Sequence, residues 1–422
     1  MKLLHIIASM DPKHGGVSQA LRTMVKGLNA HPDVKNEVIS FDDPSASFID
    51  TNSDYIHALG LGKGPWFYNS NYGSWLTQNL SRFDVVILHG LWNYQGYGLI
   101  KALRLLKSNP TKNQPNTPFK TQFFVMPHGM LDPYFQKASG RKLKALRNWL
   151  YWKLIERKVI HQASGLLFTC EAELQLARKT FAPYHPSKEL VVGLGVDEPP
   201  PRTSQMQEVF LNKCPGLNQN PYLLFISRIN EKKGVDLLID AYADYLEAEN
   251  LKTEENDKIG DTVFIRQNLV LSKLVVAGPG LETAYGKKIK SSALNLQQSE
   301  PLVFFPEMLT GDAKWGAFYH CDAFVLPSHQ ENFGIAVVEA LACGKPVLIS
   351  NQVNIHTEIA SSKAGIIADD TKLGTQALLK KWDELSPNQK IEMGKNARLC
   401  YEKYYAVSPA AQNLLKAITT GQ

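Results

Sequence analysis

The feature that most constrains the fold is the alternation of short, wholly apolar segments with longer helical ones. In the first half of the chain the apolar segments lie at residues 2–8, 36–40, 84–88, 121–126, 165–169 and 190–192. Short strands that are apolar on both faces and alternate with helices are typical of a parallel sheet with helices on both sides. The first half of the chain therefore predicts a doubly wound α/β domain.

The same pattern starts again after a break that follows Glu198. Three consecutive prolines occur there, in the segment EPPPRTSQMQ, and proline fits neither a helix interior nor a central strand. Apolar segments then resume at 221–227, 269–277, 302–305, 323–326 and 347–350. We therefore predict two Rossmann-like domains, 1–197 and 219–400, which face a central cleft. Residues 198–218 are predicted to link them, and residues 401–422 to cross back to the first domain.

Composition excludes several classes of protein. The chain is 44% apolar and 20% charged, as in ordinary globular proteins, and no run of about 18 apolar residues predicts a membrane-spanning helix. The apolar start is not followed by a cleavage site, so we expect no signal peptide. Five separated cysteines without a C-x-x-C pair argue against structural zinc or disulfides and favour a cytoplasmic location. A net charge of +6 is too small to predict nucleic-acid binding.

The segment most informative about chemistry is 327–346, PSHQENFGIAVVEALACGKP. A strand ends there, a polar loop follows, and Gly334 opens a helix whose first backbone N–H groups could bind an anion. Glu339 lies one turn inside this otherwise apolar helix. Such a carboxylate either extends to solvent or meets a polar ligand, and the residues alone favour neither reading.

The spacing E-x7-E from Glu331 to Glu339, with N-F-G after the first glutamate, resembles the signature of retaining glycosyltransferases with the GT-B fold, in particular family 4. Three further motifs occur in the order found in this family. They are Gly15-Gly16 after the first strand, Pro127-His128-Gly129 after the fourth, and Ser227-Arg228-x4-Lys233-Gly234 after the first strand of the second domain. The resemblance covers nearly the whole chain.

The resemblance implies a binding site for a nucleotide-diphosphate sugar. Arg228 and Lys233 would bind the diphosphate, where fixed cations stabilise the charge that develops on the leaving group. Gly16 would let the backbone approach the phosphate or the sugar. Glu339 would accept hydrogen bonds from the ribose. The loop after 302–305, with Met308, would contact the base, for which we expect uridine ahead of guanosine. The remaining donor-binding residues would be Asn332, Phe333, Gly334 and Ile335.

The resemblance also implies the catalytic groups and the reaction. His128 would face the donor sugar near the anomeric carbon, and Glu331 would bind sugar hydroxyls. The expected activity is that of a hexosyltransferase that moves a hexose or hexuronic acid with retention of configuration, by front-face attack. The expected role is in surface polysaccharide or glycolipid synthesis. The sequence has no D-x-D motif and no metal-ligand spacing, so we expect neither a metal nor another cofactor.

Two segments of the first domain suggest the acceptor side. His89 and Trp92 follow another strand, and we assign them to recognition of a glycan or lipid-linked acceptor. Residues 137–158 carry eight Lys and Arg side chains with Trp149 and Trp152 among them. A basic helix with interfacial aromatics can lie on an anionic membrane, which would place the protein peripherally on the inner face of the cytoplasmic membrane. The alternative is a helix whose leucine stripe packs on its own domain.

Other functions remain open to different degrees. A nicotinamide dehydrogenase would need G-x-G-x-x-G after a strand, and a P-loop kinase would need G-x-x-x-x-G-K-[ST]; both motifs are missing from the sequence. A nucleotide-sugar epimerase on the same fold and a non-catalytic nucleotide-sugar-binding protein both remain compatible with the sequence.

Overall fold

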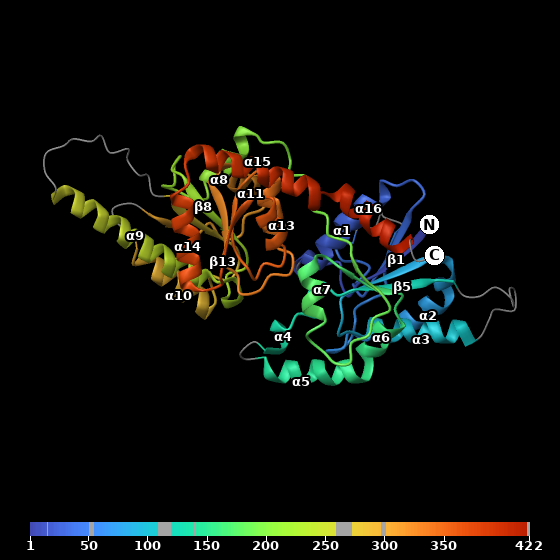
Figure 1. Ribbon diagram of the computed structural model, residues 1–422. Coiled ribbons are helices and arrows are strands. Elements are labelled where there is room, and N and C mark those ends of the chain that lie inside the picture. Colours follow the sequence, from blue (N-terminus) through green and yellow to red (C-terminus); the bar gives the residue numbers. More distant parts are fainter. Residues whose placement is uncertain are drawn as a thin grey trace. The chain divides into compact units, whose positions relative to one another are not determined.

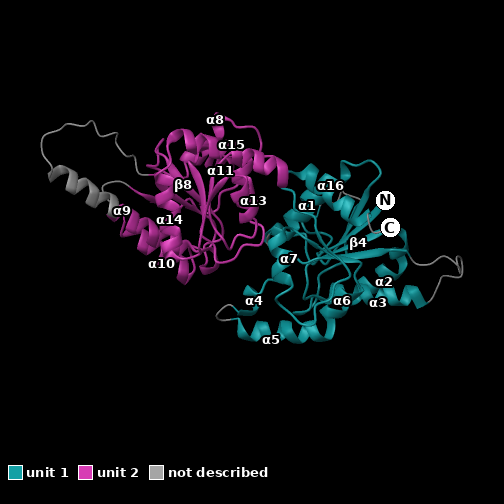
Figure 2. Ribbon diagram, in the orientation of Figure 1, with its two compact units in different colours: residues 1–197, 406–422 teal, residues 198–405 magenta. Residues whose placement is uncertain are grey.

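The chain forms two compact units (Figure 2). Unit 1 contains residues 1–197 and 406–422, and unit 2 contains residues 198–405. The computed structural model describes residues 1–14, 16–49, 55–108, 120–137, 141–258, 272–296 and 301–419. None of the helices in these ranges is both long and apolar enough to cross a membrane.

Unit 1 is built on a seven-stranded, wholly parallel sheet with the order β3-β2-β1-β4-β5-β6-β7 (Figure 1). Its strands are β1 (Lys2–Ile6), β2 (Lys35–Ser40), β3 (Ile56–Ala58), β4 (Val85–His89), β5 (Gln122–Met126), β6 (Gly165–Phe168) and β7 (Glu189–Val191). Its α-helices are α1 (Gly16–Asn29), α2 (Ser70–Asn79), α3 (Tyr94–Ser108), α4 (Tyr134–Lys137), α5 (Lys142–Tyr151), α6 (Arg157–Gln162), α7 (Glu171–Ala177) and α16 (Val407–Thr419). Shorter turns are η1 (Pro12–His14), η2 (Leu80–Arg82) and the π-helical η3 (Trp152–Glu156).

Unit 2 has a six-stranded, wholly parallel sheet with the order β10-β9-β8-β11-β12-β13. Its strands are β8 (Tyr222–Ile226), β9 (Lys273–Ala277), β10 (Val303–Phe304), β11 (Ala323–Leu326), β12 (Val347–Ser350) and β13 (Gly365–Ala368). Its helices are α8 (Ser204–Leu211), η4 (Glu231–Lys233), α9 (Val235–Lys258), α10 (Ala284–Leu294), α11 (Gly311–His320), α12 (Ile335–Ala342), α13 (His356–Ser361), α14 (Lys372–Asp383) and α15 (Pro387–Tyr404).

Each sheet has one position where the strand order reverses. In unit 1 the reversal lies between β1 and β4, and in unit 2 between β8 and β11. At such a position the connections that follow the two neighbouring strands run away from each other. This leaves a crevice outside the carboxyl ends of the strands, where α/β proteins bind their ligands. The fold therefore marks the loops that follow these strands as the places to look for function.

The prediction of two parallel α/β domains is confirmed, with differences at the edges. Residues 198–218, predicted to be a linker, instead contribute α8 to unit 2, because the Thr203 side chain caps this helix and Met206 and Phe210 are buried. Residues 401–404 complete α15, so the return to unit 1 starts at residue 406 rather than 401. Two edge strands, β3 and β13, were not predicted; both are only half-buried and short.

Candidate functional site

The loop after β8 carries the two predicted diphosphate-binding cations. Arg228 is exposed two residues beyond the strand, and Lys233 ends the turn η4. The next residue, Gly234, has a φ of +65°, and a Cβ there would lie 2.2 Å from the carbonyl oxygen of Pro327. The carbonyl oxygen of Lys232 also accepts a hydrogen bond from the backbone of His329, at 2.9 Å. The β8 loop is therefore fixed against the loop that follows β11.

This packing brings Lys233 and Glu331 together at the reversal point of the sheet. Lys233 is only 5% exposed, and its ammonium group forms an ion pair with the Glu331 carboxylate. The backbone N–H of Glu331 donates to Gln352 at 3.0 Å, and its carbonyl oxygen accepts from the N–H of Asn354 at 2.9 Å. A buried charge is stable only with a partner. The ion pair therefore joins the β8 loop to the β11 loop, although their motifs lie far apart in the sequence.

The residues after Glu331 shape the start of α12. Gly334 precedes the helix with a φ of +78°, a conformation that glycine adopts without strain. Phe333 is buried edge-on against Tyr405, and Asn332 accepts a weak hydrogen bond from Asn354 at 3.4 Å. The helix begins at Ile335 and directs its first backbone N–H groups toward this loop. Four of the residues predicted to bind the donor, Asn332, Phe333, Gly334 and Ile335, thus lie at one helix start.

Glu339 does not extend to solvent. Its side chain is 12% exposed and lies 2.5 Å from the Nζ of Lys314, which belongs to α11. Burial raises the pKa of the Glu339 carboxyl, and the Lys314 charge opposes this rise. The structure thus excludes an acid that extends to solvent and gives Glu339 a partner within the protein, whereas its role toward a ligand stays a prediction.

Close backbone contacts at Gly278 connect the loop after β9 to the loops after β8 and β10. Gly278 has a φ of +143°, and a Cβ there would lie 1.8 Å from the carbonyl oxygen of Ser227. The N–H of Gly278 donates to Glu307 at 2.7 Å, and the N–H of Ile229 donates to Pro279 at 2.8 Å. Met308, next to Glu307, has a side chain that is 66% exposed. The loop that carries Met308 is therefore joined to the Arg228 loop through the loop after β9, which lies between them.

In unit 1 the predicted catalytic histidine follows β5 in an unusual conformation. His128 has a φ of +52°, and the N–H of the next residue, Gly129, donates to the carboxylate of Glu173 at 2.5 Å. Burial lowers the pKa of His128 to about 4, so the ring is neutral at pH 7. Gly16 is the exposed first residue of α1, and Gly15 lies outside the described residues.

The two residues assigned to the acceptor have different surroundings. His89 is 3% exposed, so its effect on an acceptor would pass through His128, to which its ring is hydrogen-bonded at 2.9 Å. Trp92 is half-buried, and its backbone N–H donates to the buried Glu156 at 2.7 Å. Burial raises the pKa of Glu156 to about 8. The acceptor role of both residues stays a prediction.

Several residues at these sites were not predicted from the sequence. Lys314 is a single lysine on a helix, Glu173 is one of two acids at the start of α7, and His5 lies within an apolar strand. None belongs to a motif, so only packing reveals them. Within the described ranges, no group of three or more His, Cys, Asp or Glu side chains has the geometry to hold a metal ion.

Comparison with known proteins finds a family match within unit 2 and solved structures that share the fold of the chain. Residues 213–399 match the family of glycosyl transferases group 1. A D-inositol 3-phosphate glycosyltransferase of Gordonia bronchialis is 28% identical over 262 residues, which are 59% of this chain and 51% of that protein. The chain thus spans about half the length of this curated relative.

Two solved structures resemble the whole chain. Anabaena Alr3699/HepE, in complex with UDP and glucose, has a TM-score of 0.70 at 16% identity, with 100% of both chains covered. WaaG, a glycosyltransferase involved in lipopolysaccharide biosynthesis, has a TM-score of 0.61 at 16% identity, with 99% of both chains covered. These comparisons agree with the resemblance found in the sequence: residues 213–399 match the glycosyl transferases group 1 family, and the chain has the GT-B fold of these structures.

Proposed function

We propose that this protein is a retaining hexosyltransferase that moves a hexose or hexuronic acid from a UDP-sugar to a glycan or a lipid-linked sugar. The observation that carries the proposal is the ion pair between Lys233 and Glu331 at the reversal point of the unit 2 sheet. A cation suited to the diphosphate and an acid suited to sugar hydroxyls are in contact there. A nucleotide-diphosphate sugar has these two groups next to each other.

The chemistry requires positive charge where the diphosphate leaves. Lys233 supplies a fixed cation, and the exposed guanidinium of Arg228 can bind two phosphate oxygens at once. Such groups lower the barrier because they stabilise charge that grows in the transition state. The leaving phosphate then takes the proton of the attacking hydroxyl on the same face of the sugar. With two cations in place, we propose that the reaction needs no metal and no other cofactor.

The related proteins support the choice of donor and acceptor. HepE was solved with UDP and glucose, which favours uridine over guanosine in the loop that carries Met308. The relative that acts on inositol phosphate and WaaG, with its role in lipopolysaccharide synthesis, favour a hydroxyl of a glycan or lipid-linked acceptor. This chemistry fits a cytoplasmic enzyme that works at the inner face of the membrane.

Calorimetric titration with UDP, GDP and ADP, without metal, tests the donor site. We expect UDP to bind most tightly, with micromolar affinity. Arg228→Ala should weaken binding about 10- to 100-fold, because a hydrogen bond to a charged group contributes about 1.5–3 kcal/mol. The matched control is Arg202→Ala, which removes another exposed arginine of unit 2. Preferential binding of GDP, or binding that does not need Arg228, would contradict the proposal.

Product analysis separates the proposed transferase from the alternatives. A transferase releases UDP only as its sugar is transferred to an acceptor or to water. An epimerase yields a changed sugar without an acceptor, and a binding protein yields neither product.

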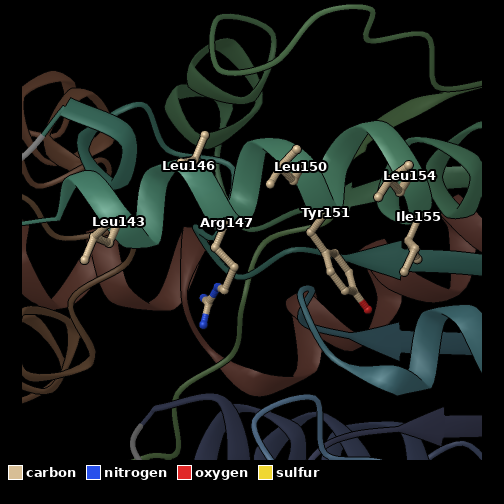
Figure 3. Close-up of a pocket in the computed structure, with 7 residues that line it drawn as sticks. All are labelled: Leu143, Leu146, Arg147, Leu150, Tyr151, Leu154 and Ile155. Atoms are coloured by element: carbon tan, nitrogen blue, oxygen red, sulfur yellow. The ribbon is translucent and has the colours of Figure 1, made fainter.

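We also propose that the basic segment 137–158, which includes α5 and η3, binds an anionic membrane surface. The leucine stripe, Leu146, Leu150 and Leu154, is 55%, 47% and 64% exposed, so it does not pack on its own unit. Leu143, which points to the other side of the helix (Figure 3), is 85% exposed. In Figure 3, Leu146, Leu150 and Leu154 point to one side, whereas Tyr151 and Ile155 point to the other. The four leucines line a surface pocket together with Arg147, Tyr151 and Ile155. Basic side chains along residues 137–158 complement anionic lipid headgroups.

Flotation with vesicles that contain phosphatidylglycerol tests the membrane proposal. The wild type should float with these vesicles at low salt and lose binding at high salt. The double variant Leu146→Ser and Leu150→Ser should bind at least about tenfold more weakly, because burying a leucine contributes about 1.5–3 kcal/mol. The control pair, Leu373→Ser and Leu399→Ser, changes exposed leucines of unit 2. Salt-independent binding, or equal loss in both double variants, would refute the proposal.

A further inference from the structure

A row of hydrogen-bonded side chains crosses the unit 1 sheet and ends at His128. Nδ2 of Asn36 donates to Oδ1 of Asn29 at 2.7 Å, and Oδ1 of Asn36 lies 3.2 Å from Nε2 of His5. Nδ1 of His5 lies 3.0 Å from Nε2 of His89. Nδ1 of His89 lies 2.9 Å from Nε2 of His128. The last four residues come from β2, β1, β4 and the loop after β5, which are neighbours in the sheet.

The sheet geometry explains why these rings meet. Alternate residues of a strand share one face. Leu4 and Ile6 of β1 belong to the core cluster on one side, as does Leu88 of β4. His5 and His89 therefore point to the other face. The parallel register pairs His5 with Ile87, so His89, two residues farther along β4, is its diagonal neighbour on that face.

The three rings are neutral at pH 7. Burial lowers the pKa of His5 and of His128 to about 4, and holds that of His89 well below 6.5. A neutral imidazole has one N–H donor and one bare nitrogen that accepts. Each hydrogen bond in the row therefore decides which nitrogen of the next ring carries the hydrogen.

The direction of the row follows from Asn36. Its amide nitrogen donates to Asn29, so its oxygen is the group that accepts from His5. His5 then carries its hydrogen on Nε2 and accepts from His89 at Nδ1. His89 in turn carries its hydrogen on Nε2 and accepts from Nε2–H of His128. Nδ1 of His128 is left without a hydrogen.

We propose that Asn36, His5 and His89 are positioning residues that hold His128 in its Nε2–H form, so that Nδ1 accepts a hydrogen bond from a hydroxyl of the sugar substrate. That the ligand is a sugar substrate rests on the proposed transferase function. Within the described residues, no other hydrogen bond is made to the His128 ring. Nδ1 is thus the nitrogen of this ring that a ligand can use.

The backbone of His128 is fixed by separate contacts. Its φ of +52° is unfavourable for a residue with a side chain, and such conformations collect at functional sites. The adjacent Gly129 N–H donates to Glu173, whose carboxylate also accepts from the N–H of Thr169 at 2.7 Å. One set of bonds therefore orients the ring and another holds the turn that carries it.

Long-range proton–nitrogen NMR of the full chain labelled with ¹⁵N-histidine tests the inference. In the wild type without substrate, His128 should be protonated on Nε2 alone. His89→Phe, which keeps a flat ring but removes both nitrogens, should give a mixture of the two His128 tautomers. Its turnover of the UDP-sugar should fall at least tenfold, and its affinity for UDP should not change. Asn36→Leu, which keeps all three rings, serves if His89→Phe does not fold.

His57→Phe is the matched control, because His57 lies on β3 in the same sheet but pairs with Glu37, outside the row. It should change neither the His128 tautomer nor turnover. Wild-type His128 protonated on Nδ1 overturns the inference, as does a variant that shifts the tautomer and keeps full turnover. Lost turnover with an unchanged tautomer also overturns it. An Nε2–H wild type that turns over no sugar nucleotide overturns the proposed function and leaves the tautomer assignment standing.

Discussion

Lys233→Met should lower kcat/KM for the UDP-sugar at least about a hundredfold, the loss typical when a group that stabilises developing negative charge is removed. The side chain is almost completely buried and is already fixed against Glu331, so the charge is oriented before the reaction starts. Methionine keeps much of the volume of the side chain and removes only the charge. Steady-state kinetics with a saturating acceptor measure the effect.

A second variant separates the chemical role of Lys233 from its role in folding. Lys233→Met alone leaves the Glu331 carboxylate without its cation, so the variant should also unfold at a lower temperature. Adding Glu331→Gln removes that unpaired charge and should restore most of the melting temperature. Turnover should remain at least about a hundredfold below that of the wild type. Recovery of turnover in the double variant would show that the pair only stabilises the unit.

The regular elements of the fold were predictable because fully apolar strands leave a clear signal. The strands on both sides of each reversal point, β1 and β4 in unit 1 and β8 and β11 in unit 2, are buried and were placed within about two residues. β3 (IHA) and β13 (GIIA) were not predicted, because each is a run of only three or four residues and is only half-buried. The helix α8 was not predicted, because the three prolines after Glu198 indicated an irregular segment. Its capping residue, Thr203, lies only two positions beyond them.

The candidate site was predictable only where a motif marks it. The sequence indicated Lys233 and Glu331 separately, but not that they pair, because they are 98 positions apart. Glu339 was identified as unusual, whereas its partner Lys314 had no signal of its own. His128 stood out between proline and glycine, but His5 and Asn36 looked like ordinary strand residues. Contacts between distant strands depend on the register of the sheet, which one sequence does not give.

Gly234→Ala should destabilise unit 2 by about 3 kcal/mol or more and abolish UDP binding. A φ of +65° costs a residue with a Cβ about 1–2 kcal/mol. A Cβ at 2.2 Å from the Pro327 oxygen also forces the backbone of one loop to move. This movement separates the β8 loop from the β11 loop and therefore Lys233 from Glu331. Hydrogen exchange of the β8 and β11 amides and calorimetry with UDP measure the two effects.

Gly311→Ala distinguishes the collision from the backbone conformation. Gly311 has a similar φ of +53°, but nothing lies within 4 Å of the position that its Cβ would take. This variant should lose only about 1–2 kcal/mol and should bind UDP normally. If both variants lose the same stability and keep UDP binding, then the contact with Pro327 does not hold the site together. If only Gly234→Ala loses UDP, the close approach of the two loops is itself a requirement for binding, which explains why glycine follows Lys233.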